Sequence, residues 1–128
     1  MVACRTWDEQ RNIECHFRTL VDLPKVEVSR IHSLQQRFVK NIHTALEPDS
    51  RVAAIVLFGS SVNLRCTIHS DLDLVVRLRP EYIDNKTKNE VSEKIQEACE
   101  WQADVLWYDR ICNNKHLMDN VLKGIQIL

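Results

Sequence analysis

Apolar residues in the first third of the chain recur every three to four positions, the spacing of an amphipathic helix. One such stretch runs from Thr6 to about Leu23 and stops at Pro24. A second runs from near Ser29 to about Leu46, and a polar turn follows it. The apolar positions of the two stretches are Ile13, Phe17, Leu20, Ile31, Leu34, Phe38, Ile42 and Ala45. The pattern therefore predicts two leading helices.

The pattern changes to that of β-strands after the second predicted helix. The segment from Val52 to Phe58 is an unbroken apolar run of strand length, which is typical of a strand covered on both faces. The segment from Leu72 to Leu78 alternates instead, with apolar residues on one face and Asp73 and Arg77 on the other. A third strand is predicted from Ala103 to Tyr108.

Two more helices and a short last strand complete the pattern. An amphipathic helix is predicted from Lys86 to about Trp101, and a shorter one from Asn114 to Lys123, ended by Gly124. The residues from Ile125 to Leu128 have the length and character of a short strand. Helices that alternate with strands predict an α/β or α+β layer architecture.

The length and the charge narrow the classes of function. A chain of 128 residues is one domain by ordinary priors, with leading helices at 1–48 and the core at 51–128. The formal net charge of -1 does not favour binding of a long nucleic acid. Affinity for nucleic acid comes mainly from Lys and Arg side chains that neutralise phosphates. The longest apolar run is far shorter than the ~20 residues of a membrane span.

The cysteines and the start of the chain indicate a cytoplasmic location. The five cysteines are widely scattered and include no Cys-x-x-Cys pair, which favours reduced thiols over a disulfide framework or a zinc ribbon. Charged residues appear at Arg5, Asp8 and Glu9 before any apolar stretch, so we expect no secretory segment.

The candidate chemistry centres on Asp71 and Asp73. Two residues apart on a strand, they project from one face with Cα atoms roughly 6.5–7 Å apart. Two carboxylates this close repel unless positive charge lies nearby. A hard cation such as Mg2+ supplies that charge, and two such ions clamp the attacking and leaving oxygens of a phosphoryl-type displacement. The pair therefore predicts a divalent metal site.

Two further features complete this predicted site. Asp104 lies in the third strand, and if that strand pairs with Leu72 to Leu78, its carboxylate reaches the same metal ions. Gly59 follows the first strand and permits close approach of a phosphate to the backbone, while Ser60 adds a hydroxyl donor. Each feature alone is more often a turn or a solvated strand end; it is their combination that indicates a metal-dependent site.

These residues resemble the nucleotidyltransferase superfamily of DNA polymerase β-like enzymes, in particular its minimal members. The signature is an apolar strand with Gly-Ser, then Ser-Asp-x-Asp about ten residues later, then an acidic residue on a later strand. Here it consists of Phe58-Gly59-Ser60, Ser70-Asp71-Leu72-Asp73-Leu74 and Ala103-Asp104-Val105. The match covers roughly Arg51 to Leu128, including the final helix, Gly124 and terminal strand.

The resemblance implies a mixed, largely antiparallel sheet backed by helices and a palm-like nucleotidyltransferase fold. It implies transfer of a nucleoside monophosphate from a nucleoside triphosphate, often ATP, to a hydroxyl acceptor with two Mg2+ ions. By position, Asp71 and Asp73 would ligate the metals, and Asp104 would complete one metal site and activate the acceptor. Gly59 and Ser60 would hold the β- and γ-phosphates. We add Ser70 and Arg77 as candidate nucleotide-binding residues.

One position departs from the family pattern, and several hypotheses about partners stay open. Leu64 stands where the family often has a second glycine, which puts turnover in doubt more than fold. Many minimal members pair with and modify a helical HEPN-type toxin. The alternative is a non-catalytic antitoxin-like module of the same fold. An aminoglycoside-modifying enzyme is a weaker alternative because the chain leaves no room for an acceptor domain, although a homo-oligomer with the N-terminal helices as its interface would supply one.

Overall fold

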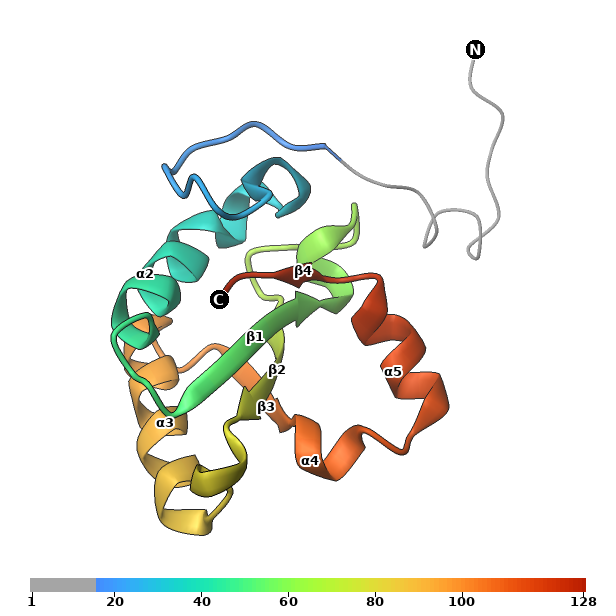
Figure 1. The fold of residues 1–128 in the computed structure, drawn as a ribbon. Coiled ribbons are helices and arrows are strands. Elements are labelled where there is room, and N and C mark those ends of the chain that lie inside the picture. Colours follow the sequence, from blue (N-terminus) through green and yellow to red (C-terminus); the bar gives the residue numbers. More distant parts are fainter. Residues whose placement is uncertain (1–15) are drawn as a thin grey trace.

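The computed structural model describes residues 16–128, and Figure 1 shows the order of their elements along the chain. The helices and strands are α2 (Gln36–Leu46), β1 (Val52–Phe58), β2 (Leu72–Leu78), α3 (Asn85–Ala98), β3 (Ala103–Trp107), α4 (Tyr108–Ile111), α5 (Lys115–Leu122) and β4 (Ile125–Gln126). Short 3-10 turns lie between them, namely η1 (Val28–Arg30), η2 (Ser33–Gln35), η3 (Gly59–Val62) and η4 (Pro80–Tyr82).

The strands form one sheet in the order β3-β2-β1-β4. β1 is antiparallel to both of its neighbours, whereas β3 is parallel to β2. A parallel pair needs a long crossover connection, and α3 lies within it. The mixed, largely antiparallel sheet that the resemblance implies is therefore confirmed. Both β1 and β2 have the bounds that the hydrophobic pattern predicts.

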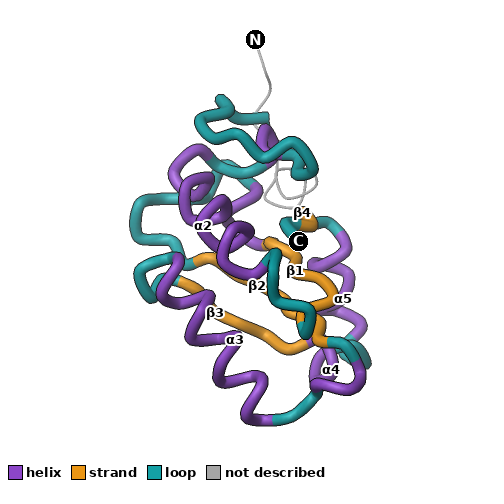
Figure 2. The backbone as a smooth tube through the Cα atoms, turned by 60° about the vertical axis from the view of Figure 1, so that its left-hand side comes forward, coloured by secondary structure: helices purple, strands orange, loops and turns teal. Residues whose placement is uncertain are grey.

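Helices cover the two faces of the sheet unequally. In Figure 2, α2 and α3 lie on one side of the strands, and α4 and α5 lie on the other. The larger apolar cluster joins α2 and α3 to the sheet through buried residues such as Ile42, Leu74 and Ile95. A smaller cluster on the opposite face contains Phe58, Val75 and Val121. This second face also carries the odd-numbered polar residues of β2.

Of the two predicted leading helices, only the second is present in the described residues, and it is shorter than predicted. Residues 6–15 of the first lie outside them, and 16–23 contain no helix. The second helix begins at Gln36 rather than near Ser29, because Ile31 is extended and His32 is also non-helical. The His32 backbone N–H donates to the Ser61 carbonyl instead of to a preceding helical turn. Residues 16–23 therefore present no helical interface to a second copy.

Later boundaries differ from the predictions by a few residues, for local reasons. α3 ends at Ala98, and Glu100 and Trp101 turn the chain with φ values of 56° and 64°. β3 ends at Trp107, because Tyr108 begins the short helix α4, which the pattern does not reveal. The last helix and the short β4 lie where the pattern predicts them.

Within residues 16–128, no helix combines the length and the apolar character that crossing a membrane requires.

Candidate active site

Gly59 turns the chain directly after β1, beside the start of β2. Its φ of +75° belongs to the left-handed region that glycine adopts at no steric cost. Its neighbour Phe58 pairs with Asp73 in the β1–β2 ladder. A Cβ atom on Gly59 would collide with the Asp73 carboxylate. The turn therefore requires glycine for two reasons, and it brings the Gly-Ser motif against the Asp-x-Asp motif.

Asp71 and Asp73 stand at the start of β2. Asp71 is exposed, whereas Asp73 is half-buried between the glycine turn and β3. Burial raises the pKa of Asp73 above its ordinary value, and the negative charges of Asp104 and Asp71 raise it further. Three carboxylates are thus close enough to interact electrostatically, with Asp73 at the centre.

Asp104 reaches the site through the parallel pairing of β3 with β2. The register sets Asp104 directly beside Asp73, and residues paired in this way project from the same face of a sheet. A hydrogen bond from the Leu72 N–H to the Gln102 carbonyl, at 2.8 Å, aligns the starts of the two strands. Asp104 is exposed, so its carboxylate faces the solvent. The condition set in the sequence analysis, that the third strand pairs with the segment from Leu72 to Leu78, is met by this register.

The connector from Gly59 to Ser70 is held by its own polar side chains. Asn63 donates from its side-chain amide to the Gly59 carbonyl at 3.1 Å, and its backbone N–H donates to the Ser60 carbonyl. Near the other end, the Ser70 hydroxyl accepts from the Thr67 N–H at 2.9 Å, which closes a turn immediately before Asp71. The Ser70 side chain therefore already has a structural role in shaping the connector.

The family model described as Polymerase beta, Nucleotidyltransferase matches residues 40–128, well over half of the chain. The chain belongs to this nucleotidyltransferase family. A search of curated proteins found no match. The matched region contains the whole sheet and all three aspartates, so the family assignment rests on the part of the molecule that builds the site.

Solved structures of toxin–antitoxin complexes contain chains with a similar fold. One is a tri-AMPylated Shewanella oneidensis HEPN toxin in complex with an MNT antitoxin: 23% identity, TM-score 0.51, with 73% of this chain and 71% of that chain covered. The MntA-HepT complex gives 22% identity and a TM-score of 0.50, covering 73% and 72% of the two chains. A toxin-antitoxin structure with AMP-PNP gives 22% identity and a TM-score of 0.54, with 70% of this chain and 72% of that chain covered. At these identities the likeness shows the fold.

Leu64 occupies an ordinary backbone region in this nucleotidyltransferase. Within residues 16–128, the non-glycine residues with positive φ are Glu100 and Trp101, so Leu64 does not adopt the conformation that would favour glycine. Its side chain is 72% exposed. The connector thus accommodates leucine without the strain that a left-handed position would impose.

Arg77 lies on the same face of β2 as Asp73 but towards the other end of the strand. Four residues of strand separate their Cα atoms by about 13 Å. The Arg77 guanidinium stacks over the Tyr108 ring, 4.7 Å from its centroid, and the buried Val75 lies between Arg77 and the aspartates. The structure therefore places the three aspartates at the starts of β2 and β3, beside the glycine turn, but it holds Arg77 apart from them.

The carboxylates fit a hard divalent cation, although their side chains stand apart from one another in this structure. In the part of the chain that the structure describes, no three His, Cys, Asp or Glu side chains are grouped closely enough to hold a metal ion. Burial first, and then the charges of Asp104 and Asp71, raise the pKa of Asp73. Carboxylate oxygens are the ligands that Mg2+ prefers. The chemistry of these donors therefore suits such a cation.

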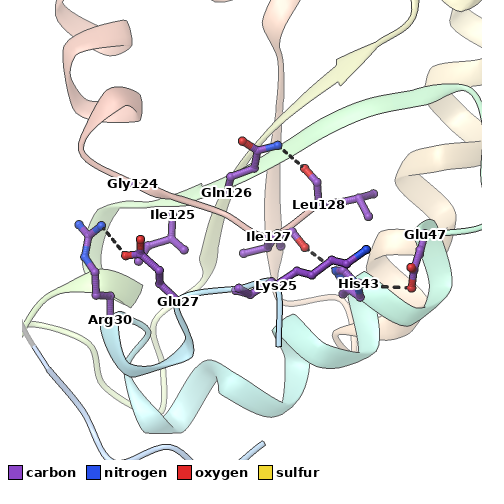
Figure 3. A pocket seen from close by; sticks show the side chains of 11 residues that line it. Lys25, Glu27, Arg30, His43, Glu47, Gly124, Ile125, Gln126, Ile127 and Leu128 are labelled. Atoms are coloured by element: carbon purple, nitrogen blue, oxygen red, sulfur yellow. Dashed lines mark hydrogen bonds and ion pairs between the residues drawn. The ribbon is translucent and has the colours of Figure 1, made fainter. Parts of the chain in front are cut away.

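A cavity of about 550 Å³ lies at the opposite edge of the sheet, beside β4 (Figure 3). None of the predicted site residues lines it. In Figure 3, His43 of α2 points to the chain end, where Nδ1 lies 2.6 Å from the Ile127 carbonyl, and Nε2 lies 3.3 Å from a Glu47 oxygen. β1 and β2 separate this cavity from Asp104 on β3. Its residues tie α2 to β4 and take no part in the candidate active site.

Two residues around the site were missed by the sequence analysis. Asn63 clamps the glycine turn as described above, and its position within the connector was the available signal. Gln35 contacts the other end of the connector from outside the region that the family model matches. A glutamine within an apolar helical stripe gives no sequence signal of such a contact.

Proposed function

We propose that this protein transfers a nucleoside monophosphate, AMP from ATP, to a hydroxyl group of a HEPN-type toxin partner. The observation that carries the proposal is the in-register pair of Asp73 and Asp104 beside the glycine turn. Membership of the nucleotidyltransferase family supports the reaction type. The nature of the partner is supported by similarity to chains of complexes that contain a tri-AMPylated HEPN toxin.

In this proposal each residue has a separate task. Gly59 and Ser60 bind the β- and γ-phosphates through the turn after β1, with Ser70 shaping the connector. Asp71 and Asp73 would hold two Mg2+ ions, with Asp104 as a further ligand of one of them. Bound there, the ions would supply positive charge against the phosphates and the acceptor oxygen. Asp104, exposed at the edge of the sheet, faces the solvent side from which a protein acceptor arrives.

The transfer requires no reactant besides the nucleoside triphosphate and the acceptor. The acceptor oxygen forms a bond to the α-phosphorus, the bond from that phosphorus to the bridging oxygen breaks, and pyrophosphate leaves. The hydroxyl proton passes to Asp104 or to water. Because the acceptor must enter from solvent, the exposure of Asp104 suits it better than half-buried Asp73 for this role.

The first test is titration of ATP with Mg2+ into the wild-type protein and into Asp71→Asn/Asp73→Asn. We expect metal-dependent binding that the double variant loses. The second test incubates the protein with its HEPN-type partner and ATP labelled at either the α- or the γ-phosphate. AMP transfer moves the α-label to the partner and leaves the γ-label in pyrophosphate. Phosphorylation would move the γ-label and contradict the proposal.

The alternative function is a non-catalytic module that neutralises its partner by binding. Its distinguishing result is stable complex formation with neither metal-dependent ATP binding nor transfer of label. The observation behind this alternative is that no three carboxylates among residues 16–128 are grouped closely enough to hold a metal ion.

A cytoplasmic location stays a prediction. The described cysteines Cys66, Cys99 and Cys112 are free thiols.

A further inference from the structure

Gln35 is a buried polar residue whose contacts lie on the connector of the candidate active site. It ends η2, immediately before α2, and its side chain is 2% exposed. Its amide nitrogen donates to the Ser70 carbonyl at 2.9 Å and lies 3.7 Å from the Cys66 thiol. Burying an amide carries a free-energy penalty unless hydrogen bonds offset it, so this side chain is held there by its contact with the residue before Asp71.

The same stretch of chain also holds the beginning of the connector. The His32 backbone N–H donates to the Ser61 carbonyl at 2.7 Å. Ser61 is fully buried within η3, the turn that Gly59 begins. Residues 32–35 thus bond to both ends of the connector, one next to the predicted phosphate-binding turn and the other next to the predicted metal ligands.

We propose that Gln35 is a positioning residue that sets the glycine turn in register with the aspartates. This inference rests on the proposed function, because the two ends of the connector must match the spacing between the phosphates and the metal ions of one bound nucleotide. Gln35 touches neither phosphate nor metal. It acts through Ser70 and through the backbone that continues into Asp71.

Two buried atoms without hydrogen-bond partners indicate a further contact between residues 32–35 and the connector. Among the described residues, Gln35 Oε1 and Ser61 Oγ are buried side-chain atoms without a hydrogen-bond partner. The Gln35 amide oxygen can only accept, whereas the Ser61 hydroxyl can donate. Residues 32–35 and η3, which carry these atoms, are already joined by the bond from the His32 N–H to the Ser61 carbonyl. Native proteins rarely leave such atoms unpaired. We therefore expect the Ser61 hydroxyl to donate to the Gln35 amide oxygen.

Gln36 provides a matched control. It is also a glutamine, fully buried, and one residue further along the chain. Its side chain bonds to the leading segment instead, accepting from the Leu20 N–H at 2.7 Å and donating to the carbonyls of Arg18 and Ile31 at 2.8 and 2.9 Å. Gln35→Met and Gln36→Met therefore each remove a buried amide group, but they break contacts to different parts of the molecule.

The experiment measures ATP–Mg2+ affinity and transfer kinetics for the two variants at a temperature where both are folded. Both should melt at lower temperature than the wild type. Gln35→Met should lower kcat/KM for transfer by about 10- to 100-fold, since small misplacements of reacting groups have effects of this size. Gln36→Met should lose less than Gln35→Met, because Gln36 reaches the connector only through the Ile31–His32 peptide group, whereas Gln35 bonds directly to Ser70. Equal losses in both variants would reduce Gln35 to a packing residue and overturn the inference.

The Ser61 contact is tested by Ser61→Ala alone and with Gln35→Met. If the two side chains pair, the double variant should bind ATP–Mg2+ as weakly as Gln35→Met, because the second change removes nothing more. Independent, multiplying effects would overturn that contact.

Hydrogen exchange separates this inference from the proposed function. In the nucleotide-free protein, Gln35→Met should speed amide exchange at 59–71, and Gln36→Met should do so at 18–31. If the wild type binds no nucleotide, the proposed function fails, while this exchange pattern still decides whether Gln35 orders the connector. Unchanged exchange at 59–71 in Gln35→Met contradicts the positioning role.

Discussion

The backbone of Gly59 lies so close to the carboxylate of Asp73 that no side chain fits between them. We therefore predict that Gly59→Ala destabilises the protein and abolishes ATP binding. The left-handed φ alone disfavours alanine by about 1–2 kcal/mol, and displacement of Asp73 adds to this loss. Thermal unfolding and nucleotide titration measure the two effects.

Gly124→Ala is the control for that prediction. A Cβ atom there meets the Leu57 carbonyl and the Phe58 Cβ on the β4 side of β1, whereas Asp73 pairs with Phe58 from the β2 side. It should lower stability and leave the affinity of the folded protein for ATP unchanged. Loss of ATP binding in both variants would show that the first effect comes from general loss of structure.

We predict that Asp73→Asn stabilises the metal-free protein at neutral pH. The pKa of Asp73 is raised in the folded state, so the fold disfavours its ionised form. This unfavourable contribution is absent below the ordinary pKa of 3.8, grows as the pH rises from there, and is fully present above the raised pKa of the folded state. The variant should therefore melt a few degrees higher than the wild type at pH 7, and the difference should vanish at acid pH.

Divalent cations should reverse that order of stability. Mg2+ or Mn2+ should raise the melting temperature of the wild type by binding the folded state, and should have little effect on Asp73→Asn. NaCl at matched ionic strength controls for charge screening. A wild type that melts equally with and without the divalent cation would speak against the metal site.

We predict that Asp104→Asn separates nucleotide binding from transfer. The side chain is exposed, so the substitution should change the free energy of unfolding by less than about 0.5 kcal/mol. ATP binding should persist, since Asp71 and Asp73 remain, whereas AMP transfer should fall by about 10²- to 10⁴-fold. Rapid transfer by this variant, measured with α-labelled ATP, would remove Asp104 from the catalytic role.

We predict a pH-dependent stabilisation by Asp49, far from the candidate site. Hydrogen bonds from Arg51 hold the pKa of Asp49 well below its ordinary value of 3.8, and Lys94 of α3 contributes a further bond at 2.8 Å. Asp49→Asn should lower the free energy of unfolding by about 2 kcal/mol at pH 7. Because the folded pKa is depressed, this stabilisation is present above the ordinary value and disappears as the pH falls. Urea unfolding at pH 7 and pH 3 checks it; an equal difference at both pH values would contradict it.

The catalytic half of the fold was predictable because its signals are local. An unbroken apolar run defines β1, and a largely alternating pattern defines β2, so their bounds follow from which residues must avoid water. The spacing of Asp71 and Asp73 places both on one strand face regardless of tertiary context. The glycine at position 59 likewise marks a left-handed turn that other residues avoid.

The leading region was mispredicted because contacts across the molecule override its helical pattern. Residues 29–35 have helical periodicity, yet the His32 N–H bonds to Ser61 and Gln35 bonds to Ser70. Both partners are distant in sequence, so no window of local residues contains the information. A buried glutamine also violates the expectation that an apolar stripe alone faces the core.

The sequence by itself determined the strands, the glycine turn and the three carboxylates, because backbone conformation and solvent avoidance act over neighbouring residues. The tertiary structure alone decided that β3 lies parallel to β2 with Asp104 beside Asp73, and that Arg77 stays apart from them. Strand register depends on the whole sheet and on the crossover through α3, and it fixes which distant residues meet.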